Sequence, residues 1–67
     1  MRVKLQSRVR EGDFIELTED VKSLYGERIS KGTVCEVIEV DINEIMVETL
    51  DDNLINLDKK SKKYKKV

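Results

Sequence analysis

The stretch ISKGTVCEVIEVDINEIMVETLDDNLINL, from Ile29 to Leu57, decides the fold of this chain. Apolar and polar residues alternate through most of it, and it contains one glycine and no proline. Alternation with a period of two is typical of strands that bury one face. We therefore predict a meander of three strands, at residues 33–40, 45–50 and 54–57, joined by polar turns at 41–44 and 51–53.

The first strand of this meander departs from strict alternation. Cys35 and Val37 fall on one face, but Val40 has the opposite parity. A β-bulge inserts one extra residue and restores the alternation beyond it. We expect such a bulge near Ile38 and Glu39, which would turn Val40 back toward the core.

Other segments must extend the meander, because a few strands alone are marginal in water. Residues 14–18 (FIELT) are rich in strand formers, and residues 1–10 alternate loosely enough for a further short strand. In residues 18–32, Thr18 suits a helix cap, and Val21, Leu24 and Tyr25 follow helical spacing. We therefore expect one short helical turn inside a long first loop. The prediction is an all-β fold, a small barrel of about five strands over residues 1–58.

These residues also resemble a known family. Small SH3-like barrels follow the pattern G-x-x-V-x-L, a variable loop, K-G-T-x-G-x-V, a short turn, I-x-V and a closing strand. The matching positions are Gly12, Ile15, Leu17, Gly32, Thr33, Val37, Val40, Ile45 and Val47. The chain is similar to uncharacterised barrels of Gram-positive bacteria, their phages and mobile elements, which carry an acidic turn like residues 51–53, and more distantly to KOW-type domains. The resemblance implies an SH3-like barrel. Because Cys35 replaces the second glycine of the pattern, RNA binding of the KOW kind is less well supported.

Charges are segregated along the chain. All 14 acidic residues lie between residues 11 and 58, where only Lys22, Arg28 and Lys31 oppose them. Residues 59–67 (KKSKKYKKV) hold six lysines and no acid, so we interpret them as a basic C-terminal tail after the barrel. An acidic body with two basic ends favours a module that binds another macromolecule.

The basic ends are the first candidate site, for nucleic acid or for an acidic partner. Lysines could follow a phosphate backbone while Tyr64 stacks on a base. The alternatives are a disordered, solubilising terminus and a tail that lies on the acidic body and screens it. The predicted binding residues are Arg8, Arg10, Lys59, Lys60, Lys62, Lys63, Tyr64, Lys65 and Lys66, which Arg2 and Lys4 would extend.

The acidic body is the second candidate site. A carboxylate surface can occupy the phosphate site of a basic protein, so the chain could be a phage- or mobile-element-type inhibitor that acts as a nucleic-acid decoy. The alternative is that these carboxylates only solvate outer faces and turns. The residues concerned are Glu36, Glu39, Asp41, Glu44, Glu48, Asp51 and Asp52.

Catalytic and metal chemistry find little support in the sequence. Histidine, the usual general base and commonest metal ligand, is absent, and the acidic turns lack the spacing of a calcium loop. Cys35 suits a buried apolar position better than a nucleophile. We therefore expect no enzyme activity, cofactor, metal or small-molecule substrate. Because no apolar run reaches the roughly 20 residues that cross a bilayer, we expect a cytoplasmic protein without membrane contact, either monomeric or weakly self-associating.

Overall fold

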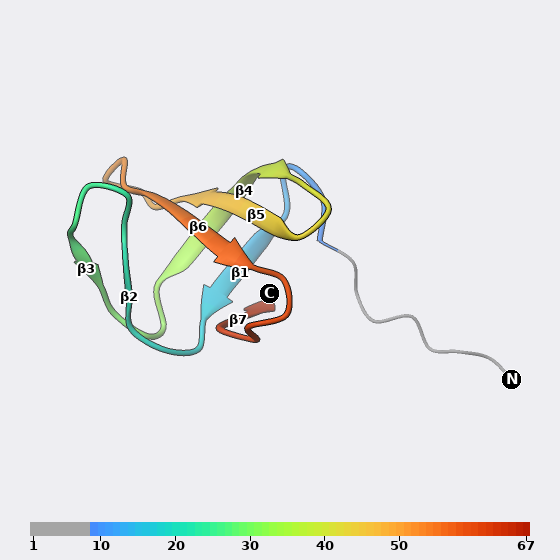
Figure 1. The fold of residues 1–67 in the computed structure, drawn as a ribbon. Coiled ribbons are helices and arrows are strands. Elements are labelled where there is room, and N and C mark those ends of the chain that lie inside the picture. Colours follow the sequence, from blue (N-terminus) through green and yellow to red (C-terminus); the bar gives the residue numbers. More distant parts are fainter. Residues whose placement is uncertain (1–8) are drawn as a thin grey trace, which may run out of the picture.

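The computed structural model describes residues 9–67, and this part of the chain is all-β, as the sequence predicts. Its strands are β1 (Phe14–Leu17), β2 (Val21–Lys22), β3 (Arg28–Ile29), β4 (Val34–Val40), β5 (Glu44–Glu48), β6 (Leu54–Asp58) and β7 (Tyr64–Lys66). Five of them form one antiparallel sheet in the order β6-β5-β4-β1-β7, and β2 and β3 form a separate two-stranded sheet. The small β2–β3 hairpin projects at one end of the molecule, while β7 lies beside β1 (Figure 1).

The predicted bulge in β4 is confirmed. Val37 lies opposite Val47, but Val40 lies opposite Ile45, so the register shifts by one residue between Val37 and Glu39. Val40 is partly buried and packs against the core. The extra residue therefore restores the alternation, as the physical role of a bulge requires.

The predicted core face is also confirmed. The aliphatic side chains at alternate positions of β1, β4, β5 and β6 are buried, and Cys35 lies among them. The core comprises Ile15, Leu17, Ile29, Cys35, Val37, Ile45, Val47, Ile55 and Leu57. Since strand side chains alternate between faces, the opposite face of the sheet carries the residues between them, which are charged at many positions and apolar at others such as Phe14 and Val34.

The predicted helical turn in residues 18–32 is wrong, because no helix occurs anywhere in residues 9–67. The chain forms the β2–β3 hairpin instead, with Val21 opposite Ile29. The buried Ser23 hydroxyl accepts hydrogen bonds from the backbone N–H groups of Tyr25 and Glu27, both at 3.1 Å. Leu24 and Tyr25 are exposed, so their helical spacing in the sequence does not correspond to a buried face.

Asp20 connects this hairpin to the loop that precedes β4 through a hydrogen bond and an ion pair. Its carboxylate accepts a hydrogen bond from the Lys31 backbone N–H at 2.8 Å and pairs with the Arg28 guanidinium at 3.1 Å. The backbone N–H of Lys31 and then the Arg28 side chain lower the pKa of Asp20 below its usual value of 3.8. Asp20 therefore neutralises one of the few cations of the acidic body.

The strand expected within residues 1–10 falls mainly on residues 1–8, which lie outside the described part, together with Arg2, Lys4 and Arg8. Val9 packs against the core and Arg10 belongs to no strand. Within residues 9–67, no helix has the length and apolar character needed to cross a membrane.

Candidate functional site

The C-terminal lysines are partly incorporated into the sheet. Tyr64 lies opposite Leu17, and its ring is half-buried against the core. Burial, followed by the charge of Asp58, raises the pKa of the Tyr64 hydroxyl above 10.0. The ring therefore takes part in packing, and its proposed stacking on a base stays a prediction.

Two lysines of β7 face carboxylates of the body. Lys65 lies opposite Glu16, with an Nζ–Oε1 distance of 3.9 Å, and Lys66 Nζ lies 3.4 Å from Asp13 Oδ2. These contacts match the alternative in which the basic end screens the acidic body. Exposed pairs of this kind contribute little to stability, but they reduce the positive charge that β7 offers to a partner.

Asp13 is the point where the two ends of the described chain meet. The Arg10 backbone N–H donates to Asp13 Oδ2 at 2.9 Å, and the Val67 N–H donates to the Phe14 carbonyl at 3.0 Å. The Arg10 N–H and then Lys66 hold the pKa of Asp13 below 3.8. The Arg10 backbone N–H and the Lys66 ammonium group thus both contact the Asp13 carboxylate, although the two residues are far apart in the sequence.

The segment between β6 and β7, which we call the lysine turn (residues 59–63), is held by hydrogen bonds at both ends. The Asp58 carboxylate accepts the Lys60 N–H at 2.9 Å, and the Asp58 carbonyl accepts the Ser61 hydroxyl at 2.7 Å. On the other side, Thr18 donates its N–H to the Lys63 carbonyl at 2.8 Å and its hydroxyl to the Lys62 carbonyl at 3.0 Å.

The four lysines of this turn are exposed. Among residues 9–67, no carboxylate oxygen lies within 4.0 Å of the Nζ of Lys59, Lys60, Lys62 or Lys63, in contrast to Lys65 and Lys66. Lys62 adopts a φ of 58°, a left-handed conformation that a lysine rarely adopts unless its surroundings fix it. The turn therefore presents four unneutralised ammonium groups on a backbone held by hydrogen bonds.

A cleft of about 270 Å³ lies between the β2–β3 hairpin and the lysine turn. It is lined by Val21, Lys22, Asn56, Leu57, Asp58, Ser61 and Lys63. Lys22 and Lys63 come from segments about forty residues apart in the sequence, and neither ammonium group lies within 4.0 Å of a carboxylate among the described residues. Sequence reasoning missed Lys22, Asn56 and Ser61, because no local pattern reports that β2 and the lysine turn face each other.

The outward side of β4, β5 and β6 carries most of the predicted acidic residues, together with Asp58, and no lysine or arginine of these strands. Two like-charged pairs lie directly opposite each other on neighbouring strands, Glu36 with Glu48 and Glu44 with Asp58. Like charges in such positions destabilise a sheet. We call this surface the acidic face; it consists of Glu36, Glu39, Asp41, Glu44, Glu48 and Asp58.

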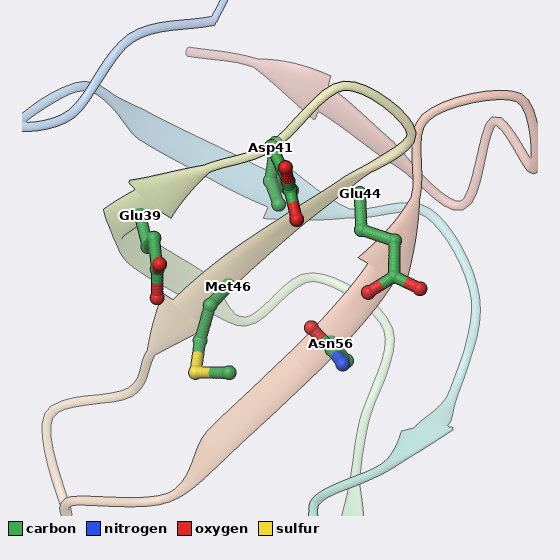
Figure 2. A pocket seen from close by; sticks show the side chains of 6 residues that line it. Glu39, Asp41, Glu44, Met46 and Asn56 are labelled. Carbon is green, nitrogen blue, oxygen red and sulfur yellow. The ribbon is translucent and has the colours of Figure 1, made fainter.

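Figure 2 shows the centre of the acidic face, a shallow hollow of about 120 Å³. The carboxylates of Glu39, Asp41 and Glu44 stand around Met46 and Asn56, which project from β5 and β6. Within residues 9–67, no group of three or more acidic or thiol side chains is arranged to hold a metal ion.

Asp51 and Asp52 lie apart from this hollow, in the turn between β5 and β6. The Thr49 hydroxyl donates to Asp51 Oδ1 at 2.7 Å, and Asp52 takes a φ of 69°. The Asn53 N–H in turn donates to the Thr49 hydroxyl at 3.1 Å. Asp51 therefore helps to close the turn, because it holds the Thr49 hydroxyl that accepts the Asn53 N–H.

Cys35 occupies the buried apolar position that its place in the sequence predicts. It is only 1% exposed, and burial raises the pKa of its thiol to about 11. A thiol in this state is neutral and unreactive near pH 7.

No protein-family model matches this chain, and the curated proteins and solved structures likewise contain no match.

Proposed function

We propose that this protein is a non-enzymatic binding module that engages an anionic macromolecule through the lysine turn. The observation that carries the proposal is the contrast within the basic end: the ammonium groups of the lysines at 59, 60, 62 and 63 lie more than 4.0 Å from every described carboxylate, whereas those of Lys65 and Lys66 face Glu16 and Asp13. Ammonium groups held on a fixed turn lose less freedom on binding than those of a free tail.

The fold is compatible with this role. The order of elements, a strand, a long loop with a hairpin, three meander strands and a last strand beside the first, supports the likeness to SH3-like barrels that the sequence motif implies. Such a likeness says little about function, because one small fold serves many functions. The charge distribution is therefore the evidence on which the proposal depends.

A matched pair of charge variants tests the proposal. Lys62→Gln with Lys63→Gln and Lys65→Gln with Lys66→Gln remove the same net charge, one pair from the lysine turn and the other from ion-paired positions. The probes are an immobilised single-stranded oligonucleotide and an immobilised glutamate-rich peptide, each eluted with a salt gradient. We expect the turn variant to elute at clearly lower salt than the β7 variant, since attraction to an anionic surface is screened by salt. Wild-type protein that binds neither probe in about 50 mM salt would overturn the proposal, as would equal losses in the two variants.

The acidic face supports a second candidate, an inhibitor that covers a basic surface of a nucleic-acid-handling protein. The specific observation is the pairing of Glu36 with Glu48 and of Glu44 with Asp58 on strands β4, β5 and β6, none of which contains a lysine or arginine. A protein partner's lysines and arginines would relieve this repulsion. Glu36→Gln with Glu48→Gln should weaken capture of a basic DNA-binding domain while leaving binding at the lysine turn unchanged; capture that persists undiminished would contradict it.

A further inference from the structure

Strand β6 is an edge strand with one side of its backbone directed at the cleft. Two hydrogen bonds at the ends of this strand set the bonding pattern with β5: the Lys59 N–H donates to the Asn43 carbonyl at 2.9 Å, and the Thr49 N–H donates to the Asn53 carbonyl at 2.9 Å. In an antiparallel ladder, bonded and non-bonded pairs alternate. The backbone N–H and C=O groups of residues 55 and 57 therefore bond to β5, while those of Leu54, Asn56 and Asp58 point to the open side.

Other segments cap the two ends of this open side. The Leu54 carbonyl accepts the Leu24 N–H at 2.8 Å, and the Asp58 carbonyl accepts the Ser61 N–H at 3.0 Å. Between them, the N–H and C=O of Asn56 have no hydrogen-bond partner among residues 9–67. The cleft thus exposes one unpaired donor and one unpaired acceptor between two closed ends.

The charges around these groups are mainly positive. Lys22 stands on the hairpin wall and Lys63 on the wall of the lysine turn. The single carboxylate in the cleft, Asp58, already accepts the Lys60 N–H at 2.9 Å. A ligand with both a main-chain amide and a negative charge would complement the unpaired Asn56 backbone groups and the two lysines of this cleft.

We infer that the cleft accepts an extended, acidic peptide segment of a protein partner, which pairs with the Asn56 backbone and places carboxylates near Lys22 and Lys63. This inference rests on the proposed function and specifies the anionic partner as a polypeptide. Addition of a strand to an exposed sheet edge supplies main-chain hydrogen bonds, while flanking side chains select the sequence. The open side from Leu54 to Asp58 spans about 13 Å at 3.3 Å per residue, which is enough for about three residues of the partner.

The same observations favour a peptide over a nucleic acid. Single-stranded nucleic acid is bound through bases stacked on aromatic rings, and Tyr64, the aromatic residue next to the lysine turn, packs against the core. A nucleic acid also has no main-chain amide that could pair with both groups of Asn56. The other sheet edge, β7, carries Lys65 and Lys66, and lysines at an edge oppose further strand pairing.

The test is a nuclear magnetic resonance titration of the full-length protein with three probes. The first is a blocked five-residue peptide of alternating glutamate and valine, the second is the same peptide with its central amide N-methylated, and the third is a short oligothymidylate. We expect the first peptide to shift the Asn56 amide signal and to slow its hydrogen exchange. N-methylation removes one donor, so it should weaken binding about threefold to tenfold.

Protein variants separate this inference from the proposed function. Lys22→Gln with Lys63→Gln should weaken binding of the first peptide several-fold more than Lys65→Gln with Lys66→Gln, which makes the same change in net charge. If the peptides bind with equal affinity, or the Asn56 signal stays still while signals of the lysine turn move, the cleft inference is wrong and the proposed function stands. Preferential binding of the oligothymidylate would have the same meaning. Binding of no probe would overturn both.

Discussion

Replacement of Val37 by alanine is the sharpest test of the core. Val37 is 0% exposed at the centre of β4, where it lies opposite Val47. The substitution removes two carbon atoms, worth about 0.8 kcal/mol each, and a cavity term adds to this in a site whose neighbours cannot collapse. We expect a loss of about 2 kcal/mol, which is a large part of the roughly 3–10 kcal/mol that stabilise a chain of this length.

Val34→Ala is the matched control for this experiment. It makes the same chemical change in the same strand, but Val34 is 45% exposed on the outward side. Urea unfolding should show a midpoint lowered by about 2 M for Val37→Ala, with an unchanged slope of about 1 kcal/mol per M, and a change below about 0.5 kcal/mol for Val34→Ala. Equal losses in the two variants would refute the assignment of the buried face.

Three further outcomes are expected. Cys35 in the native protein should react with a thiol reagent at pH 8 roughly a hundredfold more slowly than in urea-unfolded protein, because reaction requires opening of the core; equal rates would mean that the thiol is exposed. The pKa of Asp13 is lowered from 3.8, so its ionised form stabilises the fold above that pH and the contribution is lost as the pH falls through the lowered value. Asp13→Asn should therefore flatten the dependence of the urea midpoint on pH below about pH 4, and an unchanged slope would contradict this. Glu48→Lys removes the repulsion with Glu36 and should stabilise the fold by about 0.2–1 kcal/mol in thermal melts, more than Glu11→Lys in a turn; equal effects would show that the cross-strand pair is unimportant.

Side-chain parity made most of the sheet predictable from the sequence. Pairs such as Ile45 with Val47 and Ile55 with Leu57 alternate with polar residues, and strand geometry then dictates that they share the buried face. The single break in parity at Val40 located the bulge in β4, since only an inserted residue reconciles it with burial. These features depend on neighbouring residues alone.

The parts that sequence could not supply depend on contacts between distant segments. The hairpin of β2 and β3 forms because the Ser23 hydroxyl binds two backbone N–H groups, a bond pattern that the apparent helical spacing of Leu24 and Tyr25 concealed. Strand β7 pairs with β1, although nearly fifty residues separate them in the sequence. Only one side chain of β7, Tyr64, packs against the core, so the lysine-rich sequence shows no alternating apolar pattern. The cleft lies where the hairpin faces the lysine turn, so the sequence of either segment alone does not predict it.

The register of β4 against β5 gives the most direct test of the claim that one inserted residue turns the alternating aliphatic side chains inward. In an isotope-edited nuclear Overhauser spectrum, Val37 should face Val47, and the Hα of Val40 should lie close to the Hα of Ile45. Without the bulge, the register set by Val37 and Val47 would continue and place Val40 opposite Glu44. Observation of the contact with Ile45 would establish the fold on which both binding surfaces are built, and observation of the contact with Glu44 would contradict it.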